Sequence, residues 1–155
     1  MRSCFFVGHR DASEEIFDEL ADVIKRLVVE KEVTEFLVGN YGNFDRLAMR
    51  AVVKAKEMNP KIKLSVLLPY HPAERMPTII DGVDDTFYPP DMENIPRRLA
   101  IVRANKYAID HADYLVVYAW QPGSNAKKLF EYAKKRENRN LISIMELTLT
   151  SKSSH

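Results

Sequence analysis

The sequence predicts an α/β protein with a three-layer, Rossmann-like architecture, in which helices cover both faces of an open parallel sheet. Strand-like and helix-like segments alternate along the 155 residues. The strand-like segments are nearly continuous apolar runs, and the helix-like segments carry apolar residues at helical spacing. Right-handed crossovers leave few topologies, and a closed eight-stranded barrel needs a much longer chain, so an open doubly wound sheet is expected.

The elements follow one another in a regular order. The first strand, SCFFVG at residues 3–8, is short, apolar and aromatic, which is typical of a strand buried on both faces. Apolar residues then recur on one face of a helix, and Asp11 with Glu14 resembles a capping box at its start. The later segments repeat this pattern. Strands are expected at 3–8, 35–39, 62–69, 113–119 and 140–146, and helices at 16–28, 44–55, 96–110 and 125–136.

Residues 69–96 break the alternation. They contain six of the eight prolines, which predicts a long loop with at most a short strand near TFYP, residues 86–89. The remaining pattern shows no internal repeat, so we expect one domain at 1–147 and a polar, frayed tail at 148–155.

Composition narrows the cellular setting and the partners. The formal net charge is +1, which does not favour nucleic acid or an anionic membrane as a partner. No apolar run is long enough to span a bilayer, and the N-terminus becomes polar too early for a secretory signal. The single cysteine, Cys4, lies in an apolar run, as expected for a buried thiol. We therefore expect a cytoplasmic protein; its association with identical chains is left open.

Four of the five glycines follow predicted strands, in loops that would share one edge of the sheet: Gly8, Gly39, Gly42 and Gly123. Ligands of open parallel sheets bind at this carboxyl edge, and glycine allows another group to approach the backbone closely. The helix N-termini that follow such loops suit phosphate. Each loop could also be a simple tight turn, but several such loops converging on one edge favour a ligand site.

Polar residues in these loops extend the predicted site. Arg10 lies near a helix N-terminus, where its charge opposes the helix dipole unless an anion intervenes, and Arg97 and Arg98 repeat this pattern. Asp45 could contact a ribose hydroxyl or compensate the dipole of its own helix. The expected ligand-binding residues are Gly8, His9, Arg10, Gly39, Asn40, Gly42, Asp45, Pro122, Gly123, Ser124 and Asn125.

Four segments together resemble the YpsA-like family of the SLOG superfamily: FFVGHR, GNYGNFDRLA, RANKYAIDHADYLVVY and PGSNAKKLFEYAKK. The resemblance covers nearly the whole chain in order and spacing. It implies a Rossmann-like fold and binding of a nucleotide or nucleotide-derived ligand. The RANKY segment is similar to the arginine-bearing helix of the LOG-type phosphoribohydrolases in this superfamily, which makes Arg103 a further ligand-binding or catalytic candidate.

The chain departs from the LOG-type pattern at the acid that assists cleavage of the N-glycosidic bond. Those enzymes carry PGGxGTxxE, whereas PGSNAKKLFE in this chain places Glu131 one residue late. One residue rotates a helical side chain by about 100°. Glu131 and Asp45 are therefore the catalytic candidates, but the sequence favours binding over hydrolysis.

Three classes of function follow. The first is a nucleotide sensor or binding module that requires no metal or other cofactor. The second is an N-glycosidic hydrolase or deoxyribosyltransferase-like enzyme, which needs a carboxylate near the anomeric carbon. The third is a single-strand DNA binder, which needs a basic groove and stacking aromatics and is disfavoured by the net charge. Candidate stacking residues are Tyr41, Phe44, Tyr70 and Trp120.

Overall fold

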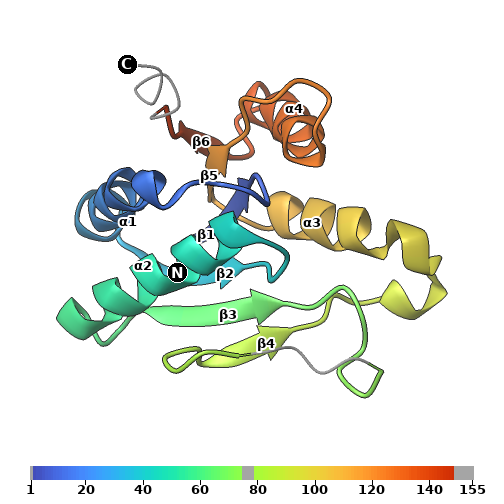
Figure 1. Ribbon diagram of the computed structural model, residues 1–155, viewed down its shortest axis with the longest axis horizontal. Coiled ribbons are helices and arrows are strands. Elements are labelled where there is room, and N and C mark those ends of the chain that lie inside the picture. Colours follow the sequence, from blue (N-terminus) through green and yellow to red (C-terminus); the bar gives the residue numbers. More distant parts are fainter. Residues whose placement is uncertain (1, 75–78, 149–155) are drawn as a thin grey trace.

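The computed structural model describes residues 2–74 and 79–148, within which six strands form one parallel sheet in the order β4-β3-β2-β1-β5-β6 (Figure 1). The predicted three-layer, Rossmann-like fold is confirmed. The strands are β1 (Arg2–Gly8), β2 (Val33–Val38), β3 (Lys63–Leu67), β4 (Asp85–Phe87), β5 (Tyr114–Tyr118) and β6 (Ser143–Glu146), and the α-helices are α1 (Phe17–Lys31), α2 (Asn43–Met58), α3 (Ala100–Asp110) and α4 (Asn125–Glu137).

The two faces of the sheet have separate apolar cores. Cys4 and Phe6 of β1 pack in the core that contains the buried faces of α1 and α2. Phe5 and Val7 point to the opposite face, into the core with α3 and α4. Successive side chains of a strand alternate between faces, so a central strand covered on both sides must be apolar throughout.

The order of the strands reverses at β1. The chain runs from β1 to β2 on one side, and returns later to place β5 on the other side of β1. Figure 1 shows β5 and β6 above β1, with β2, β3 and β4 below it. In open parallel sheets this reversal leaves a crevice outside the carboxyl ends of the two strands, where ligands bind.

The proline-rich segment, residues 69–96, leads from β3 towards α3, and its first part joins β3 to the adjacent parallel strand β4 without an α-helix among the described residues. It contains β4 and the short 3₁₀ turn Met92–Asn94, while residues 75–78 lie outside the described residues. The expected long loop with one short strand is therefore confirmed where the structure describes it. Of the expected polar tail, residues 149–155 lie outside the described part.

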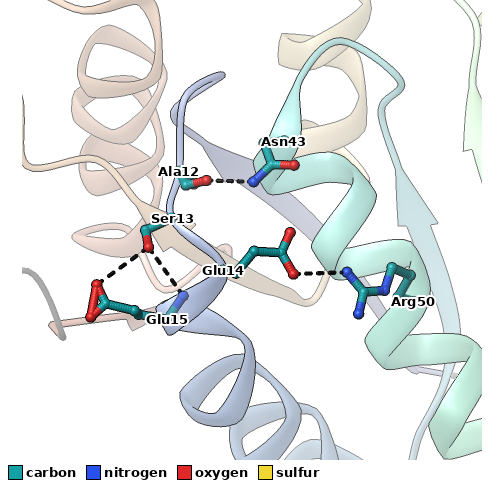
Figure 2. Close-up of polar contacts among 6 residues, drawn as sticks. All are labelled: Ala12, Ser13, Glu14, Glu15, Asn43 and Arg50. Carbon is teal, nitrogen blue, oxygen red and sulfur yellow. Dashed lines mark hydrogen bonds and ion pairs between the residues drawn. The ribbon is translucent and has the colours of Figure 1, made fainter.

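The helix after β1 begins differently from the capping box expected at Asp11. Ser13 caps a 3₁₀ turn, Glu14–Ile16, that leads into α1, and its hydroxyl accepts a hydrogen bond from the Glu15 amide at 3.2 Å (Figure 2). Ser13 suits this position because its short side chain reaches the first free amides of the helix. The capping prediction was wrong by two residues.

The same loop is attached to α2. Glu14 pairs with Arg50 at 3.1 Å, and the Asn43 side chain donates to the Ala12 carbonyl (Figure 2). The backbone N–H of Asn43 also donates a hydrogen bond to the Arg10 carbonyl at 2.8 Å. These contacts hold the loop after β1 against the first turn of α2. Among the described residues, no helix is long and apolar enough to cross a membrane.

Candidate functional site

A cavity of about 390 Å³ lies at the carboxyl ends of β1 and β5, where the strand order reverses. Its wall combines the loop after β1, the first turns of α2 and α4, and the first half of α3. The volume is within the usual range for small-molecule sites, about 300–1,000 Å³.

The cavity brings together seven of the residues expected from the sequence: Gly8, His9, Arg10, Gly42, Asp45, Ser124 and Asn125. Six other candidates are not among its lining residues: Gly39, Asn40, Arg103, Pro122, Gly123 and Glu131. The expected convergence of the loops after β1, β2 and β5 therefore occurs, but only part of each loop reaches the cavity.

Gly42 is required by the chain itself. A Cβ atom at this position would lie 2.6 Å from Arg10 Cα and 2.7 Å from Arg10 Cβ, closer than such atoms can approach. At Gly8 a Cβ would likewise collide with the Phe44 ring, at 2.2 Å. The close approach that the sequence attributed to a ligand is made by neighbouring protein atoms, so these two glycines carry no evidence of a ligand.

The loop before α4 has a conventional turn and cap. Gly123 has φ of +76°, a conformation that glycine adopts without strain. Ser124 then caps α4 by accepting from the Lys127 amide at 3.1 Å, while its hydroxyl donates to the Gln121 carbonyl at 2.9 Å. Because Ser124 and Asn125 line the cavity, the positive end of the α4 dipole borders it.

His9 connects the loops after β1 and β5. It is 4% exposed, and its Nε2 atom accepts from the Gln121 amide at 3.2 Å. The ring contacts Tyr118 and Trp120 edge to face, and burial lowers its pKa. A neutral imidazole with its proton on Nδ1 satisfies this hydrogen bond, so His9 acts as a positioning residue for the cavity wall.

Asp45 is the buried carboxyl group of the cavity. It is 8% exposed, in the first turn of α2, and its Oδ2 atom accepts from the Tyr41 amide at 3.1 Å. Burial raises its pKa from 3.8 to about 7, although the Tyr41 amide and the Arg10 charge both act in the opposite direction. A carboxyl group that titrates near neutrality inside a cavity can hold or deliver a proton.

Five further polar residues line the cavity: Asp11, Tyr41, Arg98, Asn105 and Gln121. Of the arginine pair noted in the sequence, Arg97 pairs with Glu74, whereas the Arg98 side chain has no ion pair or hydrogen bond among the described residues. Asn105 is 6% exposed and donates to the Ile101 carbonyl at 2.8 Å. No sequence signal identified Asn105 or Gln121, because neither lies beside a glycine or at a helix start.

The two candidates suggested by the LOG-type resemblance lie outside this cavity. Arg103 is exposed on α3. Burial raises the pKa of the nearby Tyr132 hydroxyl, and the positive charge of Arg103 opposes this change only weakly. Glu131 lines a separate hollow between α3 and α4, together with Lys128 and Lys135. The rotation expected from its displaced position in the motif is consistent with this placement.

The aromatic candidates are divided among different surroundings. Phe44 is 1% exposed and stacks on Tyr118 in the core, whereas Tyr41 lines the cavity. Trp120 is 52% exposed beside His9. Tyr70 lies under the Arg97 guanidinium, 4.5 Å from ring to charge. The four residues do not form one stacking surface.

Two further observations bear on the site. In the part of the chain that the structure describes, no group of three or more His, Cys, Asp or Glu side chains is arranged to hold a metal ion. A scan against models of protein families finds none that matches the chain, and a search of curated proteins finds no significant match.

Proposed function

We propose that the protein binds a phosphorylated ligand, a nucleotide or a nucleotide derivative, in the cavity at the strand-order reversal, and acts as a sensor or binding module. The observation that carries this proposal is the meeting of two helix N-termini with two arginines around one cavity. Gly42 and Asp45 bring the start of α2, Ser124 and Asn125 bring the start of α4, and Arg10 and Arg98 add formal positive charge.

The two arginines and the two helix N-termini suit an anion, and they act against the carboxyl group of Asp11, which also lines the cavity. Helix N-termini and arginine side chains both stabilise phosphate, the arginines through charge-assisted hydrogen bonds. The Arg10 Nε atom donates a hydrogen bond to the Tyr41 carbonyl at 3.3 Å. The Arg98 side chain has no hydrogen bond or ion pair within residues 2–74 and 79–148. Arg98 is exposed, so its guanidinium group is accessible to an anionic ligand.

Position and resemblance support the nucleotide class. Rossmann-like sheets bind nucleotides at this reversal of strand order. The resemblance of the sequence to the YpsA-like family favours the same class of ligand. Because Glu131 lines another hollow, the acid suggested by the LOG-type motif is absent from the cavity lining, which favours binding over hydrolysis by that route.

A thermal-shift screen of nucleoside phosphates, ADP-ribose and nicotinamide dinucleotides tests the proposal. A ligand at a hundred times its Kd stabilises the native state by about 2.7 kcal/mol. For a chain of this length we expect a rise in Tm of about 5–10 °C. Replacing Arg98 with glutamine should remove most of this shift and leave the Tm of the free protein nearly unchanged, since the exposed Arg98 side chain has no hydrogen bond or ion pair among the described residues.

Arg103→Gln is the matched control. It removes the same charge from α3, outside the cavity, whereas Arg98 lies in the 3₁₀ turn Arg97–Leu99 directly before that helix. If Arg103→Gln removes the shift and Arg98→Gln does not, the ligand lies on the surface suggested by the LOG-type resemblance, and our site is wrong. If no compound in the screen shifts the wild-type protein, the proposed function fails.

Asp45 favours a second candidate function, an N-glycosidic hydrolase or deoxyribosyltransferase-like enzyme. Its buried carboxyl group, with a pKa of about 7, could protonate the departing base. Chromatography of nucleoside monophosphates incubated with the protein tests this candidate. Release of free base that is abolished in Asp45→Asn and retained in Glu131→Gln would replace the binding module by an enzyme.

A further inference from the structure

Positive charge is concentrated in one segment of this nearly neutral chain. Residues 97–140 contain ten Lys or Arg and four Asp or Glu, a formal charge of +6, whereas the whole chain carries +1. The rest of the molecule is therefore net negative, at −5. The low net charge of the whole chain is therefore the sum of one positive and one negative region, and it does not by itself argue against an anionic ligand at the positive region.

Part of this charge lines a hollow of about 310 Å³ between α3 and α4, which we call the basic groove. Its positive residues are Lys106, Lys128 and Lys135, and its one acidic lining residue is Glu131. Lys106 lies over the Tyr132 ring at 5.1 Å, a cation–π contact that directs its ammonium group into this region. Tyr132 is itself fixed, since its hydroxyl donates to Asp110 at 2.7 Å.

Within the described part of the chain, ion pairs occupy two of the basic residues near the groove but none of its lysines. Arg136 pairs with Asp110 at 3.2 Å, and Lys134 pairs with Glu137 at 3.4 Å. Among the described residues, the structure gives no ion pair to the three lysines of the groove or to Glu131. Glu131 lies three residues after Lys128 and four before Lys135 on α4 and offsets part of their charge, which leaves the lining of the groove with a formal charge of +2.

The basic groove is continuous with the cavity of the proposed function. Val102, Asn125 and Leu129 line both hollows. Lys128 and Lys135 lie three and ten residues beyond Asn125 on α4, about 5 and 15 Å along the helix axis. A ligand held at the first turn of α4 can therefore extend directly into the groove.

We propose that the basic groove binds a second phosphate group of the ligand that occupies the cavity. The ligand is then a nucleoside that carries phosphate groups at two separate positions. This inference rests on the proposed function. The lining of the groove extends along α4 from Asn125 to Lys135, about 15 Å along the helix axis. That short length fits a compact ligand better than a nucleic-acid strand, which would need a longer track and stacking aromatics.

Isothermal titration calorimetry at low salt can test this proposal with each nucleoside 5′-monophosphate and the matching 3′,5′-bisphosphate. We expect the bisphosphate to bind the wild-type protein roughly tenfold more tightly, the effect of several exposed ion pairs. The triple variant Lys106→Gln, Lys128→Gln and Lys135→Gln should lose this advantage and keep its affinity for the monophosphate.

A variant with the same charge change elsewhere serves as the control. Lys25, Lys31 and Lys61 are exposed and lie outside both hollows, so their replacement by glutamine should preserve the tenfold advantage. Equal affinity of the wild-type protein for both compounds overturns the inference, as does an advantage that survives in the groove variant. Affinity that continues to rise along a series of longer oligonucleotides overturns it in favour of a nucleic-acid strand. If neither compound binds, this inference fails, and the thermal-shift screen decides the proposed function. If the monophosphate binds and the second phosphate adds nothing, this inference fails and the proposed function stands.

Discussion

Replacing Asp45 with asparagine should change how the stability of the protein depends on pH. Asp45 is buried in the first turn of α2, and burial raises its pKa from 3.8 to about 7. In the unfolded chain the carboxyl group ionises near pH 4, whereas in the folded protein it stays neutral until about pH 7. The folded state thus binds more protons between these values, and stability falls as pH rises through this interval.

The size of the effect follows from the shift in pKa. A difference of about three units corresponds to about 4 kcal/mol, fully present below the unfolded pKa and fully lost above the folded one. Between about pH 5 and pH 8 the wild-type protein should lose about 3 kcal/mol of unfolding free energy through this group. Asparagine has nearly the same shape but no ionisable proton, so the Asp45→Asn variant should lack this loss.

Urea unfolding of both proteins at several pH values measures the difference directly. Subtracting one curve from the other cancels the titration of all other groups and any constant cost of the amide. The variant should gain about 3 kcal/mol on the wild-type protein between about pH 5 and pH 8. Asp22→Asn, which changes an exposed carboxyl group on α1, should keep the wild-type slope. A difference between Asp45→Asn and wild type that is constant with pH, or that decreases as pH rises, would refute the argument from burial.

Three further predictions concern the walls of the cavity. Gly42→Ala should destabilise the protein by about 1–3 kcal/mol in urea unfolding, because the new Cβ atom would collide with the Arg10 backbone. In Gly123→Ala the new Cβ atom would have no atom within 4 Å, so this variant should lose only about 1 kcal/mol, through the positive φ of residue 123. Ser124→Ala should cost about 1 kcal/mol through loss of the α4 cap, and an unchanged urea midpoint would contradict that role. The affinity for a nucleoside monophosphate, measured by calorimetry, should fall as Asp45 ionises above about pH 7. The affinity of the wild-type protein divided by that of the Asp45→Asn variant should fall as well, because the titration of the ligand cancels in this ratio.

The fold could be predicted from the sequence because its determinants are local and repeated. Each central strand is apolar on both faces, as in Phe5 and Phe6 of β1, and only a sheet covered on both sides buries such a run. The cap before α1 was assigned to the wrong residue because Asp11 and Ser13 both suit a helix cap. Which of the two residues caps the helix depends on how the loop contacts Asn43 and Arg50 of α2. These contacts join distant parts of the chain and cannot be inferred from the local sequence.

The cavity was only partly predictable, for a related reason. Residues that follow a strand directly, such as His9 and Arg10, lie at the carboxyl edge in any parallel sheet, so the order of elements alone places them. Asn105 comes from the middle of α3, and its position depends on how that helix packs beside α4. Such packing is a tertiary property that the helical period does not determine.

The glycine pattern led to this cavity for a reason that does not hold. Gly8 and Gly42 do lie at the cavity, but each is required by an adjacent side chain or backbone, Phe44 or Arg10. The loops that meet at the strand-order reversal are packed tightly against one another, and tight packing of backbones selects glycine whether or not a ligand binds. The evidence for a ligand therefore rests on groups with unused binding capacity. Arg98 has this property, and so do the lysines of the basic groove, because packing of the chain does not explain their charge.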